Sequence, residues 1–186
     1  MKKSIATVLT LFVTTLFVNA QKVIKVGDTL SNIQLQSTKG DVYSLNNHKT
    51  KGYIIIFMTP SCDHCLAYVG RASSLNLKYQ SKGFPVVAIG PYGDNENDYP
   101  YDAMPAMKKL AEEKAFTFPY LADEKFKYTW LFDINQTPKA VVLKKLKQGY
   151  IVTYIGNIDD EPNEKKVPKK KYVELAVNKL LIENVH

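Results

Sequence analysis

The chain has 186 residues, 45% of them hydrophobic and 23% charged, with a formal net charge of +7. That length suits a single domain with a sizeable core. The positive excess lies in lysines near the C-terminal end, without interleaved aromatic residues, so the composition argues against nucleic-acid binding. Only two cysteines are present, and the three histidines show no ligand spacing, which argues against a structural zinc site.

The N-terminus has the three parts of a secretory signal peptide. Lys2 and Lys3 form a basic start, an apolar stretch runs from Ile5 to Val18, and Val18-Asn19-Ala20 supplies a small-residue cleavage site. The apolar stretch is shorter than the roughly 20 residues of a membrane-spanning helix. We therefore predict a signal peptide at 1–20, a mature domain at 21–186, a periplasmic or secreted location, and no stable membrane span after cleavage. A retained N-terminal anchor is the alternative.

Apolar runs typical of buried strands alternate with helical patterns along the rest of the chain. The first predicted element is a hairpin with strands at Ile33–Leu35 and Val42–Leu45. The others are, in order, a strand at Tyr53–Met58, a helix at Cys65–Gln80, a strand at Pro85–Ile89, a helix at Ala103–Lys114, a short strand at Phe118–Leu121, a short helix at Glu124–Leu131, strands at Ala140–Leu143 and Tyr150–Ile155, and a helix around Val173–Leu181.

Two connections predict how these strands pair. A helix between the strands at Tyr53–Met58 and Pro85–Ile89 implies a right-handed parallel crossover. The turn Lys147-Gln148-Gly149 makes the last two strands antiparallel. The order therefore predicts an α/β fold, with a mixed central sheet and helices on both faces.

Both cysteines lie in Pro60-Ser61-Cys62-Asp63-His64-Cys65, where a helix follows a buried strand. A C-x-x-C pair at this place is typical of a redox dithiol. Free backbone N–H groups and the helix dipole favour the thiolate at Cys62, which we predict to be the exposed nucleophile, with Cys65 as the resolving thiol. A structural disulfide here would close almost no loop and would stabilise little. The metal alternative is a copper site that uses adjacent Cys and His side chains.

Three segments make the chain resemble the thioredoxin-fold superfamily from about Val26 to Leu181: Phe57–Cys65, which contains this motif, Gln136-Thr137-Pro138, and Tyr154–Asp160. Within it, the chain is similar to the extracytoplasmic redoxins of the alkyl hydroperoxide reductase/thiol-specific antioxidant (AhpC/TSA) and TlpA/ResA types. The resemblance implies a thioredoxin fold with an N-terminal hairpin and an inserted helix and strand. It also implies a cis Thr137–Pro138 bond against the dithiol and a backbone edge at Thr137 for an extended substrate segment.

The predicted function is therefore an extracytoplasmic thiol–disulfide oxidoreductase. Its expected partners are protein thiols and disulfides in an exported compartment and an unidentified redox donor or acceptor, and no bound cofactor or metal is expected. The candidate catalytic residues are Cys62 and Cys65, and the candidate substrate-binding residues are Pro60, Ser61, Asp63, His64, Thr137 and Pro138.

Three further segments carry weaker predictions. The loop Pro91–Asn97 leaves the carboxyl end of a strand, where ligands bind in open α/β sheets, so we expect it to rim the site. Tyr99-Pro100-Tyr101 would offer an aromatic surface to a partner. The pair Asp159-Asp160 is interpreted as an acidic turn after an edge strand.

Two departures from the resembled families leave the redox direction open. Ile56 replaces the buried carboxylate of thioredoxins, and Tyr68 replaces a glutamate of the TlpA/ResA type. The proton of Cys65 then goes to His64, Asp63 or water, or the protein works mainly as an oxidant.

A thiol-dependent, peroxiredoxin-like antioxidant is the alternative enzyme. Thr59 matches the threonine of the peroxiredoxin motif Pro-x-x-x-Thr-x-x-Cys, but Ile55 stands at the position of the proline. The only arginine, Arg71, lies nine residues after Cys62 and therefore roughly 13 Å along the predicted helix.

Overall fold

Strand β4 (Gly52–Phe57) lies at the centre of the sheet, and all six of its residues are buried. The computed structural model describes residues 23–163 and 165–183, so the predicted signal peptide at 1–20 lies outside the described residues. Successive side chains of a strand point to opposite faces. Ile54 and Ile56 accordingly belong to one hydrophobic core, and Tyr53, Ile55 and Phe57 belong to a second core across the sheet.

The sheet has eight strands in the order β1-β8-β7-β4-β5-β6-β2-β3. β4 runs parallel to β5 and antiparallel to β7, which confirms the predicted crossover and the mixed sheet. The other strands are β1 (Thr29–Leu30), β2 (Gln34–Ser37), β3 (Val42–Ser44), β5 (Val86–Gly90), β6 (Tyr120–Ala122), β7 (Lys139–Lys145) and β8 (Tyr150–Gly156).

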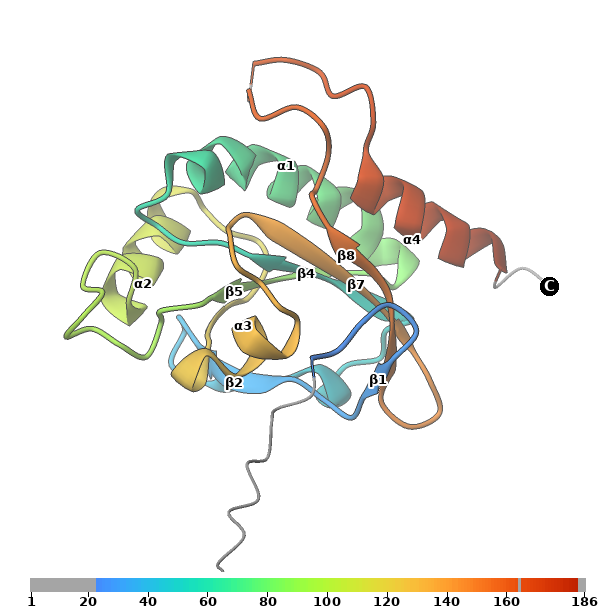
Figure 1. The fold of residues 1–186 in the computed structure, drawn as a ribbon, viewed down its shortest axis with the longest axis horizontal. Helices are drawn as coiled ribbons and strands as arrows, with labels where there is room; N and C mark the ends of the chain where they lie inside the picture. The colour runs from blue at the N-terminus through green and yellow to red at the C-terminus, as the bar shows by residue number, and fades with distance from the viewer. Residues whose placement is uncertain (1–22, 164, 184–186) are drawn as a thin grey trace, which may run out of the picture.

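Helices cover both faces of this sheet (Figure 1). Residues of α1, α2 and α4 pack in the core that contains Ile54, whereas α3 packs in the core that contains Phe57. The helices are α1 (Asp63–Tyr79), α2 (Met104–Glu113), α3 (Lys127–Leu131, after a 3-10 turn at Glu124–Phe126) and α4 (Tyr172–Glu183), with further 3-10 turns at Leu45–Asn47 and Gln80–Lys82. Among the described residues, no helix is both long and apolar enough to cross a membrane.

The turn between β7 and β8 ends at Gly149, and its backbone requires a glycine at this position. Gly149 has a φ of +70°, which disfavours residues with a side chain, and a Cβ added there would clash with the carbonyl oxygen of Leu30. Leu30 belongs to β1, which pairs with the start of β8 and was not predicted from the sequence. The turn therefore lets β1 approach the hairpin closely.

Candidate active site

Cys62 is the N-cap residue of α1, and its backbone is extended, with φ −87° and ψ 112°. Its Sγ accepts a hydrogen bond from the backbone N–H of Cys65 at 3.3 Å. The sulfur therefore lies at the positive end of the helix dipole, where a negative charge is stabilised. Cys62 is half-buried rather than exposed, so the prediction of an exposed thiol was too strong. Both cysteines are free thiols in this structure.

Cys65 lies one turn further along α1 and is fully buried. The backbone N–H of Thr59 donates to its Sγ at 3.4 Å, and the Thr59 hydroxyl oxygen lies 4.0 Å from the same sulfur. Burial raises the pKa of the Cys65 thiol to about 12, because the thiolate loses its solvation there. Cys65 is thus held as a neutral thiol one turn inside the helix from Cys62.

The segment after α3 brings a backbone carbonyl to the dithiol. The Thr137–Pro138 bond is cis, as the resemblance implies. The Cys62 thiol donates to the carbonyl oxygen of Thr137, with 3.7 Å between sulfur and oxygen. The Cys62 sulfur is therefore placed between the first turn of α1 and the backbone that precedes β7.

An open groove of about 330 Å³ lies beside the dithiol. It contains three of the predicted substrate-binding residues, His64, Thr137 and Pro138. The remaining lining residues are Tyr68 of α1, Gln136, and Asn157, Ile158, Asp159, Asp160 and Pro162 from the segment after β8. Pro60, Ser61 and Asp63 do not line it. The groove runs from the N-terminal turn of α1 to the segment after β8, and neither Cys62 nor Cys65 is among the residues that line it.

Ser61 faces a residue that the sequence analysis missed. Its backbone N–H and its hydroxyl each donate to the carboxylate of Asp102, both at 2.8 Å. Asp102 comes from the end of the segment between β5 and α2, and it fixes the turn that precedes Cys62. None of the residues of the loop Pro91–Asn97, which was predicted to rim the site, lines the groove beside the dithiol, and Gly93, Asp94 and Glu96 line a different cavity, next to β2 and β3.

The predicted aromatic segment Tyr99-Pro100-Tyr101 lies in the chain between the loop Pro91–Asn97 and Asp102. The Tyr99 ring stacks on Tyr92 with ring centres 4.2 Å apart, and Tyr101 is 79% exposed. Tyr101 directly precedes Asp102, whose carboxylate bonds to Ser61. Its contact with a partner remains a prediction.

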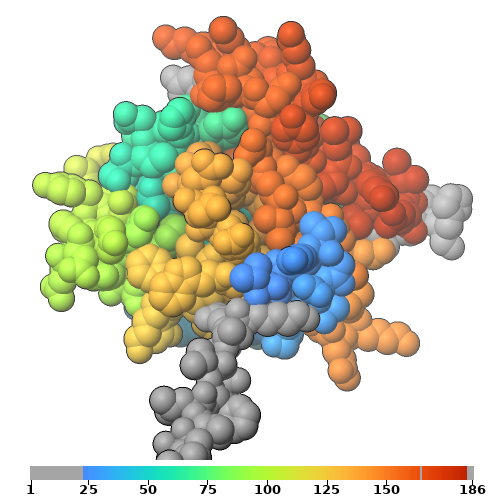
Figure 2. Space-filling view, in the orientation of Figure 1, coloured from blue at the N-terminus to red at the C-terminus, as the bar shows by residue number. Residues whose placement is uncertain are grey.

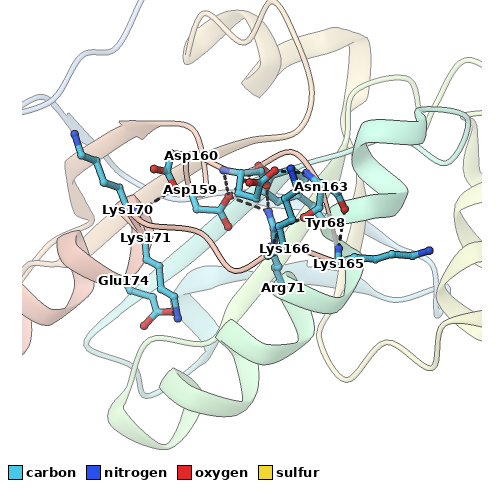
Figure 3. Close-up of polar contacts among 11 residues, drawn as sticks. Tyr68, Arg71, Asp159, Asp160, Asn163, Lys165, Lys166, Lys170, Lys171 and Glu174 are labelled. Carbon is cyan, nitrogen blue, oxygen red and sulfur yellow. Dashed lines mark hydrogen bonds and ion pairs between the residues drawn. The ribbon is translucent and has the colours of Figure 1, made fainter.

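Asp159 is not part of a solvated acidic turn, and this corrects the interpretation of Asp159-Asp160. Its side chain is 4% exposed, and it forms an ion pair with Arg71 of α1 at 2.9 Å (Figure 3). The hydroxyl of Tyr68 donates to the same carboxylate oxygen at 3.0 Å. Asp160 is exposed, as expected, and one of its carboxylate oxygens accepts the backbone N–H of Lys170. Sequence reasoning could not find the pair because Arg71 and Asp159 are 88 residues apart.

Comparison with known proteins identifies the family. A model described as AhpC/TSA family matches residues 26–160. The chain belongs to the AhpC/TSA family. Solved structures of similar fold include an uncharacterized conserved protein from Geobacillus kaustophilus, which is 26% identical over 86% of this chain and 83% of that one, with a TM-score of 0.74. No curated protein matches the chain.

Two further structures share the fold with this AhpC/TSA protein. The thioredoxin domain of a thiol-disulfide oxidoreductase from Bacteroides vulgatus is 18% identical over 72% of this chain and 91% of that one, with a TM-score of 0.53. A mutant of PrxQ from Xylella fastidiosa is 15% identical over 87% of this chain and 98% of that one, with a TM-score of 0.62. The predicted thioredoxin fold and the predicted resemblance are thereby confirmed.

The structure shows the surroundings of Ile56 and Tyr68, the two residues at which this AhpC/TSA chain departs from the resembled thioredoxin types. Ile56 is buried in the core, and the Tyr68 hydroxyl is bonded to Asp159. Burial, reinforced by the neighbouring Asp159 carboxylate, raises the pKa of Tyr68 to about 12, so Tyr68 remains a hydrogen-bond donor at neutral pH. Within residues 23–163 and 165–183, no group of three or more His, Cys, Asp or Glu side chains is placed to hold a metal ion.

Proposed function

We propose that this AhpC/TSA-family redox protein exchanges dithiol and disulfide with exported protein partners through Cys62 and Cys65. One observation carries the proposal: the Cys62 sulfur lies at the N-terminus of α1, 3.7 Å from the Thr137 carbonyl oxygen, and beside an open groove. A nucleophilic sulfur with a backbone edge next to it suits a disulfide carried by an extended chain.

Each exchange consumes one disulfide and one dithiol. The Cys62 thiolate attacks one sulfur of the partner disulfide, so that a mixed disulfide forms and the other partner sulfur leaves as a thiolate that takes up a proton. Cys65 then loses its proton and attacks the Cys62 sulfur. The second partner thiolate leaves, and the protein retains a Cys62–Cys65 disulfide. Two electrons have passed to the partner, and the reverse sequence oxidises a partner dithiol.

The proton of Cys65 must leave before the second attack, because its pKa is raised to about 12. His64 lines the groove and is exposed, so it is placed to exchange protons between the site and water. Asp63 is the first residue of α1 and does not line the groove. We therefore favour His64 or groove water over Asp63 as the acceptor.

The exported location is supported by the N-terminal sequence. A basic start, a short apolar stretch and a small-residue site at Ala20 have the pattern of a secretory signal peptide. In an oxidising compartment, partner disulfides persist long enough to be substrates of such a dithiol.

The proposal is tested by equilibrating the purified protein with a series of reduced and oxidised glutathione mixtures. Trapping of free thiols should show a reversible conversion of two thiols to one disulfide. At the midpoint of this transition, each molecule should carry either two free thiols or none. The Cys62→Ser and Cys65→Ser variants should lack this two-thiol transition. A protein whose two cysteines stay reduced across the whole series would contradict the proposed function.

Peroxide reduction is a second candidate, because a PrxQ shares the fold and Thr59 lies where the peroxiredoxin motif places a threonine. The geometry at the sulfurs disfavours it. The Thr59 hydroxyl oxygen lies 4.0 Å from the Cys65 sulfur, and among the described residues Thr59 has no hydrogen bond to Cys62. Arg71 donates to Asp159 and to backbone carbonyls of the segment after β8.

We accordingly expect hydrogen peroxide to oxidise Cys62 at about the rate of an ordinary thiolate. The only guanidinium of the chain, that of Arg71, is engaged with the segment after β8, so the leaving oxygen has no fixed guanidinium to stabilise it. Stopped-flow measurement of Cys65→Ser at several pH values, with a free thiol of similar acidity as the reference, gives this rate. A rate more than about 10³-fold above the reference would make peroxidase the better assignment, since that is the size of effect that fixed charges supply.

A further inference from the structure

The segment after β8 stands out from the body of the molecule as a long loop. This β8–α4 loop comprises residues 157–171, of which 164 is not described. In Figure 2 it projects beside the start of α1. Its first residues, from Asn157 to Asp160, and Pro162 line the groove next to the dithiol, together with Thr137 and Pro138. The position of this loop therefore sets the width of the groove.

Three side chains attach the loop to α1, and we call Tyr68, Arg71 and Asp159 the Arg71 cluster (Figure 3). One guanidinium nitrogen of Arg71 donates to the Asp159 carboxylate and to the carbonyl oxygen of Glu161. The other donates to the carbonyl oxygens of Asn163, at 2.7 Å, and Lys166, at 3.3 Å. A single side chain thus bonds to four places along the loop.

Tyr68 reinforces this attachment from the preceding turn of α1. Its hydroxyl donates to Asp159 and to the carbonyl oxygen of Glu161, each at 3.0 Å. The guanidinium carbon of Arg71 lies 4.6 Å from the centre of the Tyr68 ring, so the two side chains also stack. The Asp159 carboxylate accepts the backbone N–H of Glu161 as well, which closes a tight turn at the base of the loop.

The loop has little apolar support behind it. A second cavity of about 330 Å³ lies on the far side of the Arg71–Asp159 pair, between α1, the loop and the start of α4. Ile158 is buried at the base of the loop, but the residues from Asp160 to Lys171 are all partly or fully exposed among those described. The Arg71 cluster is therefore the main described connection between the middle of the loop and the helix that carries the cysteines.

We propose that Tyr68, Arg71 and Asp159 are positioning residues that hold the β8–α4 loop as a wall of the groove, and so make the dithiol selective for disulfides carried by an extended polypeptide segment over small-molecule disulfides. The inference rests on the proposed thiol–disulfide exchange. An extended segment that pairs with the Thr137 backbone needs the loop wall of the groove to be fixed before it binds, because ordering a loop on binding reduces affinity. A small disulfide needs only the sulfur of Cys62.

The experiment compares two substrates of the reduced protein in single-turnover reactions. One is a peptide disulfide with extended chains, labelled with a fluorophore and a quencher, and the other is dithiodipyridine, whose product absorbs in the ultraviolet. In Arg71→Gln, the peptide concentration that gives half the maximal rate should rise about tenfold, while the maximal rate and the rate with dithiodipyridine change less than about twofold. Hydrogen exchange in residues 157–163 should become faster in the same variant.

Three further variants separate positioning from damage to the fold. Asp159→Asn and Tyr68→Phe keep the contacts of Arg71 with the loop carbonyls, so we expect smaller increases of about threefold in the same concentration. Lys78→Gln is the matched control, since it removes the ion pair between α1 and Glu174 of α4 without touching the groove, and it should behave as the parent protein.

The outcomes are distinct. Equal losses with both substrates in folded variants, or no change with either, would overturn the positioning role. A parent protein that reacts with dithiodipyridine but shows no saturation with the peptide would also overturn it. A parent protein that reacts with neither substrate would instead refute the proposed exchange itself.

Discussion

Replacing Cys65 with serine should leave partner proteins covalently attached to Cys62, whereas replacing Cys62 with serine should attach none. In Cys65→Ser, the remaining sulfur still attacks a partner disulfide, but no second thiol lies beneath it to release the mixed disulfide. In Cys62→Ser, the remaining thiol is fully buried and held neutral by its raised pKa, so the first attack does not occur. We expect at least about a tenfold difference in the trapped material.

Non-reducing electrophoresis of each variant isolated from cells, followed by mass spectrometry of the shifted bands, measures this difference. The bands should disappear on reduction, and the trapped proteins should be exported ones. The double variant Cys62→Ser/Cys65→Ser is the control for non-covalent association. Identical band patterns for the two single variants, or none for either, would argue against dithiol exchange.

The second large effect is a difference in reactivity between the two thiols. In variants that keep one cysteine each, Cys62 should react with iodoacetamide at pH 7 at least about 10²-fold faster than Cys65. Cys65 is expected to be the slower thiol because burial raises its pKa from 9.0 to about 12, which favours the neutral thiol. The reactive thiolate of Cys65 then falls about tenfold for each pH unit below 12.

The pH profile distinguishes this explanation from simple shielding. The alkylation rate of Cys65 in the folded Cys62→Ser variant should keep rising with pH well beyond about 9. In denaturant, the rate should stop rising once the pH exceeds the ordinary pKa of a cysteine. Circular dichroism at each pH shows whether the variant is folded. Equal rates for the two folded variants at neutral pH would contradict the assigned roles of nucleophile and resolving thiol.

Local patterns in the sequence predicted most of the strands and helices, whereas the thioredoxin fold came from the resemblance. The strand at Tyr53–Met58 is a continuous apolar run, which predicted that it is buried, and the C-x-x-C pair directly after it predicted the helix that follows. The cis bond at Thr137–Pro138 came from the resemblance and not from the residues, because most bonds before proline are trans.

The residues that the sequence analysis missed owe their position to tertiary contacts. Asp102 lies in a polar segment without any motif, and only the fold brings it to Ser61. Asp159 follows a strand and precedes another aspartate, which is typical of a solvated turn, but its burial depends on Arg71 from another element. β1 is only two residues long, too short for an alternating pattern to be recognised.

The order in which the chain is synthesised gives the position of the cysteines a further meaning. Cys62 and Cys65 precede the Thr137 carbonyl, the strands β7 and β8, and the loop that Arg71 holds. Cys65 is buried together with Ala140 and Val142 of β7 and with Val173 of α4, all of which are made later. Closing such distant contacts is a late step in folding. We therefore expect a newly made chain to carry two accessible thiols, and the burial that distinguishes Cys65 to be completed when its last strands and helix have packed.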